Sequence, residues 1–230
     1  MALALNRESR KAEADWRALA GRFFSREEGR PWRWYHGLLF YVLVQGLTFA
    51  LSGLVNRWQG RRISSPGQLL GDVAYFEELK QSIFAPPAWV FGPAWTINNL
   101  SVIWGLLRVL NKPASSPGRG TYLALQAASW LDYVIFSAAY FGLRSPLNAL
   151  VLTLLMLDLT VASGLVALLR LRDSLVALSL ATLFLWLLLA STAAVFQALW
   201  NRDAFYGLGP FAEPSPRLLK GGLAGRGGKD

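Results

Sequence analysis

The side chains of this 230-residue chain that could take part in chemistry are few. With one histidine and no cysteine, no metal site, nucleophile–base pair or phosphate-binding loop can be assembled from it. What remains is a set of carboxamides, carboxylates and tryptophans inside long apolar runs. Such groups can stack on a flat molecule and hydrogen-bond its polar edge, so the sequence favours binding over catalysis.

The densest group of these side chains lies in the stretch FAPPAWVFGPAWTINNL, residues 84–100. Four side chains share one helix face by their i, i+3, i+4, i+7 spacing: Trp95, Asn98 and Asn99 within this stretch, and Val102 just after it. Two carboxamides inside hydrocarbon must face protein, water or a ligand. Trp89 and Phe91 precede them, and Pro93 inside the helix is expected to kink it.

Two carboxylates, Asp132 and Asp158, lie deepest in apolar runs, and acids inside membrane spans are functional candidates by default. Asp158 lies opposite a stripe of small residues, which favours helix or subunit packing. Asp132 lies beside the aromatic residues of its own run, next to Ser129 and Phe136, and is the better candidate for ligand contact. His36 stands at the mouth of the first run, where an interfacial aromatic belt explains it better than the alternative, an axial position on haem.

The elements that must position these side chains are apolar runs that nearly lack charge. The hydrophobic share is 53%, the charged share is 16%, and the mean hydropathy is +0.33. Five runs approach the roughly 20 residues with which a helix crosses hydrocarbon. They cover residues 37–55, 88–110, 121–143, 147–169 and 174–200. Because lipid offers the backbone no hydrogen-bond partners, we expect an all-α integral membrane protein, a five-transmembrane-helix bundle with a long first loop.

Three further runs also carry polar and aromatic side chains on one helical face. These faces consist of Tyr41, Gln45, Thr48 and Ser52 in the first run, Gln126, Trp130, Tyr133, Ser137 and Tyr140 in the third, and Thr182, Trp186, Ala193 and Gln197 in the fifth. Each face alone is explained by ordinary packing, in which small and polar residues join membrane helices. Together with the first loop, residues 56–87, they predict a cavity inside the membrane that this loop covers.

The two ends of the chain differ from the membrane domain, residues 37–201. Residues 1–36 are a basic amphipathic arm that suits either a helix on an anionic membrane surface or a solvated segment. Residues 202–230 are rich in glycine and proline, and we expect them to be disordered. Because basic residues flank the spans, the net charge of +9 argues for contact with the lipid bilayer and against nucleic acid as a partner.

The distribution of basic residues also gives an expected orientation. The side of the membrane that holds the N-terminus carries 13 lysines and arginines, and the other side carries 10. We expect a multi-pass protein of a bacterial cell membrane, and the positive-inside rule favours an N-terminus in the cytoplasm.

The segment PPAWVFGPAWT resembles the signature of the TspO/MBR family, the tryptophan-rich sensory proteins related to the mitochondrial translocator protein or peripheral benzodiazepine receptor. Three other segments are similar to family motifs: YFEELKQSIFAPP to WYxxLxKPxxxPP, YFGLRSP to FFGxxxP, and LFLW to YLxW of the fifth helix. The resemblance covers about residues 37–201.

This resemblance implies a five-helix bundle, often dimeric, that binds porphyrins, haem and other flat lipophilic molecules in a cavity capped by the first loop. By motif it assigns four pocket positions: Trp95, Trp186, Tyr75 and Phe76. The chain departs from the family pattern at Asn98 and Asn99, which replace Leu-Tyr. It departs again at Leu131 and Asp132, which stand in place of Leu-Asn, one residue out of register with the following Phe-Gly.

Two functions follow as hypotheses. In the first, a tetrapyrrole such as porphyrin or haem, or a similar planar lipophilic small molecule, is held by a sensor, carrier or scavenger that needs no obligatory cofactor. The expected binding residues are Trp95, Trp186, Asn98, Asn99, Asp132, Tyr75, Phe76, Trp89, Phe91 and Tyr133. An enzymatic variant, photo-oxidative breakdown of porphyrin, has no acid–base pair or metal site to support it. In the second hypothesis the chain is a structural or assembly subunit of a larger membrane complex, and its pocket is degenerate. Its partners are then the other subunits of that complex, whereas the first hypothesis suits a homodimer.

Overall fold

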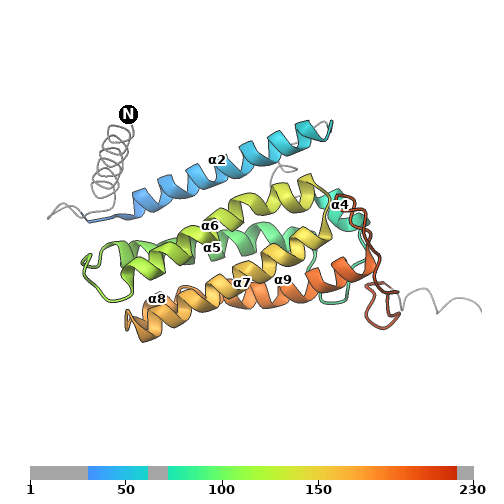
Figure 1. Cartoon of the computed structure of the whole chain (residues 1–230). Coiled ribbons are helices and arrows are strands. Elements are labelled where there is room, and N and C mark those ends of the chain that lie inside the picture. The colour runs from blue at the N-terminus through green and yellow to red at the C-terminus, as the bar shows by residue number, and fades with distance from the viewer. Residues whose placement is uncertain (1–30, 62–71, 222–230) are drawn as a thin grey trace, which may run out of the picture.

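A computed structural model of the chain describes residues 31–61 and 72–221, and five long helical segments lie side by side in it (Figure 1). The long helices are α2 (Trp34–Trp58), α5 (Phe91–Leu110), α6 (Arg119–Ser137), α7 (Pro146–Leu169) and α9 (Ala181–Trp200). Shorter elements join them: α4 (Val73–Glu78), a 3-10 turn (Ala88–Val90), a π-helical turn (Ala138–Gly142) and α8 (Ser174–Leu178). Among the described residues, three segments are long and apolar enough to cross a membrane by length and composition: Trp34–Trp58, Pro146–Leu169 and Ser174–Trp200.

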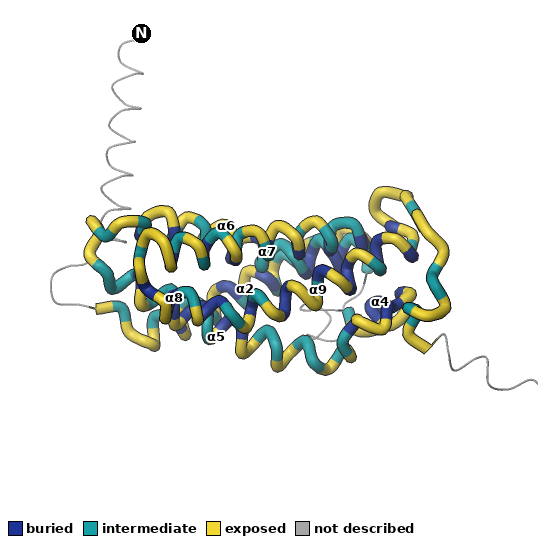
Figure 2. The backbone as a smooth tube through the Cα atoms, turned by 90° about the horizontal axis from the view of Figure 1, so that it is seen from below, coloured by how far each residue is buried: buried dark blue, intermediate teal, exposed yellow. Residues whose placement is uncertain are grey.

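Helix α7 holds the bundle together, since it packs against both α6 and α9. Helix α2 lies at one edge, where it packs against α6 and α5 (Figure 1). The buried positions of α2 form one stripe of mostly small residues: Gly37, Val44, Thr48 and Ser52. A Cβ atom on Gly37 would lie 2.6 Å from Ile103 Cγ2, so glycine permits the close approach of α2 to α5. Figure 2 shows buried residues gathered on the inward faces of the helices and in α4.

Helix α5 begins at Phe91, three residues later than the second apolar run, because a 3-10 turn occupies Ala88–Val90. Pro93 is therefore in the first turn of α5, where the missing N–H would have no intrahelical partner in any case. The expectation of a kink at Pro93 inside this helix was wrong, since the proline lies at the beginning of the helix.

The third run ends in a π-helical turn, Ala138–Gly142, in which the N–H of Leu143 donates to the carbonyl of Ala138 at 3.0 Å. A π turn spans five residues where an α turn spans four, so it accommodates one additional residue in the helix. Relative to the family pattern, the position of Asp132 is one residue out of register with the Phe-Gly pair that follows. The additional residue in the π turn, which lies between Asp132 and the end of this pair, agrees with that offset.

The fifth run is divided between α8 and α9 at Ser179 and Leu180. The hydroxyl of Ser179 donates to the Val176 carbonyl at 2.7 Å, and the Ser179 carbonyl accepts from the Ser101 hydroxyl at 2.7 Å. Gly105 of α5 provides the room for this contact, since a Cβ there would lie 2.0 Å from Ser179 Oγ. Serine hydrogen bonds to nearby carbonyls compete with the helical pattern, which explains the break.

The segment after α9 folds back onto the loop that contains α4 (Figure 1). The N–H of Ile83 donates to the Leu218 carbonyl and the N–H of Lys220 to the Gln81 carbonyl, each at 2.8 Å. Residues 203–221, which the composition led us to expect as disordered, are thus held by hydrogen bonds as far as they are described. The basic arm up to residue 30 and residues 222–230 lie outside the described residues.

An ion cluster joins the end of α5 to the beginning of α8 at the opposite end of the bundle. Asp173 caps α8 and binds Arg108 Nε at 2.8 Å and Lys112 Nζ at 2.7 Å. Burial opposes ionisation of Asp173, but hydrogen bonds from Lys112 and Arg108 outweigh it and hold the pKa of this carboxyl at about 2, below its ordinary 3.8.

Because its pKa is lowered in the folded state, Asp173 stabilises the protein above about pH 4, and this contribution is lost as pH falls toward about 2. We therefore expect Asp173→Asn to lower the thermal midpoint at pH 7 and to lose its effect near pH 2. Thermal unfolding in detergent, followed by circular dichroism across this range, measures the difference. If the thermal midpoint of the variant stays below that of the unchanged protein by the same amount down to pH 2, the ionised Asp173 carboxylate is not the source of the stabilisation.

Candidate ligand-binding site

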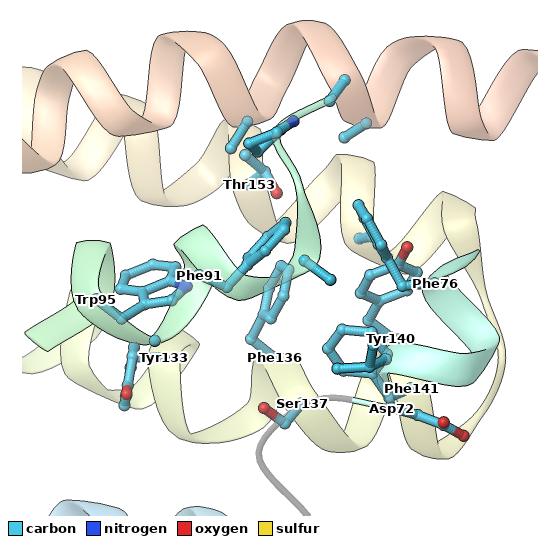
Figure 3. Close-up of a pocket in the computed structure, with 18 of the residues that line it drawn as sticks. Asp72, Phe76, Phe91, Trp95, Tyr133, Phe136, Ser137, Tyr140, Phe141 and Thr153 are labelled. Atoms are coloured by element: carbon cyan, nitrogen blue, oxygen red, sulfur yellow. The ribbon is translucent and has the colours of Figure 1, made fainter. Parts of the chain in front are cut away.

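A cavity of about 320 Å³ lies inside the bundle at the end that α4 covers (Figure 3). Its volume falls within the range of small-molecule sites, roughly 300–1,000 Å³. The aromatic residues that line it are Tyr41, Phe76, Phe91, Trp95, Tyr133, Phe136, Tyr140 and Phe141. They come from α2, α4, α5, α6 and the π turn, while α7 and α9 add the smaller residues Ala149, Thr153, Ala190, Ala193 and Ala194. The cavity therefore has an aromatic wall facing a wall of small side chains.

Edge-to-face contacts fix the orientation of the aromatic rings. Phe76 of α4 meets Phe91 of α5 with ring centroids 5.1 Å apart, and Trp95 meets Tyr133 at 5.2 Å. Such pairs contribute about 0.5–1.5 kcal/mol beyond the area that they bury. The first of them also attaches the loop to the membrane helices, because Phe76 belongs to α4.

A polar cluster ties three helices together at the Tyr133 end of the cavity. The hydroxyl of Tyr133 accepts hydrogen bonds from Gln45 Nε2 and from Asn99 Nδ2, each at 3.2 Å. Gln45 and Tyr133 line the cavity, whereas Asn99 does not. This cluster places a small polar group in an otherwise apolar wall, an arrangement that orients a ligand.

A second polar chain links the cavity to the loop that covers it. The Tyr140 hydroxyl donates to Gln197 Oε1 at 2.8 Å, and Gln197 Nε2 donates to Gln81 Oε1 at 2.7 Å. Gln81 Nε2 in turn donates to the carbonyl of Phe76. Since Tyr140 and Gln197 line the cavity, the covering loop is held in place by side chains that a ligand would touch.

Of the ten expected binding residues, the structure brings four to the cavity wall: Phe76, Phe91, Trp95 and Tyr133. The helical faces from which the cavity was predicted also contribute Tyr41, Gln45, Ser137, Tyr140, Ala193 and Gln197. Trp186 lies behind this wall, with its ring 5.4 Å from Phe91 and 6.3 Å from Trp95. It is buried, and its Nε1 has no hydrogen-bond partner among the described residues. Trp186 can therefore act on the cavity through Trp95 and Phe91.

The other expected residues lie away from the cavity lining. Asn98 and Asn99 are buried in α5, and Asp132 is buried in α6 with neither carboxylate oxygen hydrogen-bonded within the described residues. Trp89 is 75% exposed and borders a shallower groove outside α4. Tyr75 is buried beside the cavity, where its ring lies 5.9 Å from that of Tyr140.

Asp72, Phe141 and Thr153 line the cavity although no helical periodicity marked them for it. Asp72 precedes α4, and its carboxylate accepts from the N–H of Tyr75, a capping pattern that fixes the beginning of that helix. Phe141 belongs to the π turn, where the phase of the helix changes. Thr153 belongs to the stripe of small residues opposite Asp158, with Thr160, Gly164 and Ala167, and the sequence predicts a packing role for that stripe.

The fold and this cavity define a multi-pass, all-helical membrane protein with an internal aromatic pocket under its first loop. Residues 46–200 match the model of the TspO/MBR family, and the chain belongs to this family. None of the curated proteins compared with the chain matches it. The family and the five-helix membrane fold expected from the sequence are confirmed.

Proposed function

We propose that the protein binds a tetrapyrrole, either porphyrin or haem, or a similarly planar lipophilic molecule in this cavity and acts as a sensor, carrier or scavenger. The observation that carries the proposal is the aromatic lining, which offers ring faces and edges to a flat apolar molecule. Family membership supports it, because the resemblance in the sequence already implied this class of ligand.

The residues have separable parts in this proposal. Trp95, Phe91 and Phe76 contact the face of the ligand, and the Tyr133 hydroxyl meets a polar group at its edge. Asn99 acts through Tyr133, to which it donates, and Trp186 acts through Trp95.

A titration with protoporphyrin IX tests the proposal. The detergent-solubilised protein is titrated while the Soret band is followed, with Trp95→Ala, Trp186→Ala and the double variant in parallel. We expect saturable binding that Trp95→Ala weakens about tenfold, equivalent to about 1.4 kcal/mol, and that Trp186→Ala weakens less because it does not line the cavity.

Trp104→Ala is the matched control, since Trp104 lies on the same helix, is 50% exposed and is not part of the cavity lining. The Trp104→Ala variant is expected to bind protoporphyrin IX with the affinity of the unchanged protein. A double variant of Trp95 and Trp186 that binds porphyrin as tightly as the unchanged protein would refute the proposal.

A second candidate function, that of a structural or assembly subunit, is supported by the outer face of α7. Asp158 is exposed there, between the exposed Leu154 and Leu165 and near the middle of the helix. An acid at this depth is costly in lipid, so a partner helix that covers it would stabilise the protein. Purification in mild detergent distinguishes the two functions, because stoichiometric copurification with other membrane proteins supports this one and a bare homodimer or monomer counts against it.

A further inference from the structure

Two arginines at the covered end of the cavity have no carboxylate partner in the described part of the chain. The ion pairs there join Arg108 and Lys112 to Asp173, at the opposite end of the bundle. Arg61 and Arg144 make none, and the segment that follows Arg61, residues 62–71, contains no acidic residue. Within residues 31–61 and 72–221, neither guanidinium group is therefore held in an ion pair.

The two guanidinium groups are held in place by contacts with residues at the cavity. Arg61 Nη1 donates to the carbonyl of Phe141 at 3.2 Å. Arg144 lies over the ring of Tyr75, with Cζ 5.2 Å from the ring centroid, and its Nε is buried without a hydrogen-bond partner among the described residues. Burial lowers the pKa of Arg61, and the positive charge of Arg144 nearby lowers it further. Asp72 acts on Arg61 in the opposite direction. The two guanidinium groups thus lie close enough to act on one another and form one site.

This site is continuous with the cavity. Phe141, whose carbonyl binds Arg61, lines the cavity, and so does Tyr140, whose ring contacts Tyr75. Figure 3 shows Phe141, Tyr140 and Asp72 together at one end of the cavity. The hydroxyl of Tyr75 is also buried without a partner among the described residues, and burial raises its pKa, so it stays a hydrogen-bond donor. An acceptor that entered here would therefore meet three donor groups.

The backbone holds Arg144 in an unusual conformation. Its φ is 51°, in the left-handed region that residues other than glycine rarely adopt. The N–H of Ala204 donates to the Arg144 carbonyl at 3.2 Å, so the segment after α9 supports this conformation. Three carboxylates also act on this site: Asp72, which lines the cavity, acts on Arg61, and Asp203 and Glu78 act on Tyr75. Asp72 already accepts from the N–H of Tyr75, Asp203 accepts from donors such as the N–H of Leu147, and Glu78 is exposed. Among the described residues, none of the three forms an ion pair with either arginine.

We propose that Arg61 and Arg144 bind acidic groups of the ligand, so that the cavity selects planar lipophiles with a carboxylate edge and orients this edge toward the covering loop. The proposal rests on the proposed function and names the ligand class more closely: a porphyrin with free carboxylates and not a neutral planar lipophile. Guanidinium groups suit this role because their N–H groups match the two oxygens of a carboxylate.

The test compares protoporphyrin IX with its dimethyl ester, which keeps the ring and removes both charges. Both are titrated into the unchanged protein, into the double variant Arg61→Gln, Arg144→Gln, and into the control Arg57→Gln, Arg202→Gln, in neutral detergent. The control removes two charges from exposed positions at the same end of the bundle. We expect the diacid to bind about tenfold or more tightly than the ester, with this preference lost in the Arg61 and Arg144 variant and kept in the control.

Binding of the ester is the internal check, since a variant that binds the ester normally is folded. Equal binding of acid and ester by the unchanged protein would overturn the inference while leaving the proposed function intact. A preference that survives in the Arg61 and Arg144 variant, or that the control also loses, would likewise overturn it. Failure of the unchanged protein to bind either porphyrin would contradict the proposed function itself, and the inference with it.

Discussion

Replacing Asp203 by alanine is expected to destabilise the protein by about 3 kcal/mol and to lower its thermal midpoint by roughly 6–12 °C. The Asp203 side chain is almost fully buried, at 1% exposure, and four donors converge on it. Its Oδ2 accepts from the Ser145 hydroxyl and, at 3.0 Å, from the N–H of Leu147. Its Oδ1 accepts from the N–H groups of Phe205 at 3.0 Å and Tyr206 at 2.9 Å. The variant leaves these donors without their acceptor, which costs more than a single bond contributes.

The effect should extend beyond the carboxylate, because Ser145 also caps α7 by accepting from the N–H of Asn148 at 3.1 Å. Thermal unfolding in detergent, monitored by circular dichroism, measures the loss. Glu213→Gln is the matched control, since Glu213 lies on the same segment but is exposed and has no hydrogen bond within the described residues. If Asp203→Ala unfolds within 2 °C of the unchanged protein, the contacts of Asp203 do not hold the segment in place.

The same residue shows where the sequence stops being informative. The five helices could be predicted because each is a long apolar run, a local property of the chain. Asp203 follows the last run in a segment rich in glycine and proline, and its donors at Ser145 and Leu147 are more than 50 residues away along the chain. No local pattern encodes such pairings, so composition alone suggested disorder. The π turn at Ala138–Gly142 escaped prediction too, although the one-residue offset from the family motif marked the place.

The cavity wall was predictable only in part, for a geometrical reason. Neighbouring residues of a helix point about 100° apart, so Asp132 and Tyr133 both flank the aromatic face of α6. Periodicity cannot decide which of them meets the cavity, and in the structure it is Tyr133. Trp186 does lie on the inward face of α9 as expected, but Trp95 and Phe91 stand between it and the cavity. Which of several inward-facing side chains reaches the cavity depends on how the neighbouring helices pack. The sequence pattern of a single helix therefore cannot decide it.

Replacing Ala193 by phenylalanine is expected to weaken ligand binding on the order of a hundredfold, equivalent to about 2.7 kcal/mol. Ala193 is 6% exposed, lines the cavity from α9, and belongs to the same buried cluster as Phe76 and Tyr140. A phenyl ring at this position would occupy the space between the small-residue wall and the aromatic wall. Because the ring fills an existing cavity of about 320 Å³, we expect the folded state to keep its stability while the ligand loses its site.

Val195→Phe is the matched control, since it makes a similar enlargement on the same helix at a side chain that is 36% exposed and outside the cavity lining. Porphyrin titration of the three proteins, with thermal unfolding of each, separates steric exclusion from loss of fold. An Ala193→Phe protein that unfolds normally and binds as tightly as before would mean that the ligand site lies elsewhere. An Ala193→Phe protein that binds poorly, beside a normal Val195→Phe protein, would place the ligand between Ala193 and the aromatic wall, since steric bulk at that point is then the one difference between them.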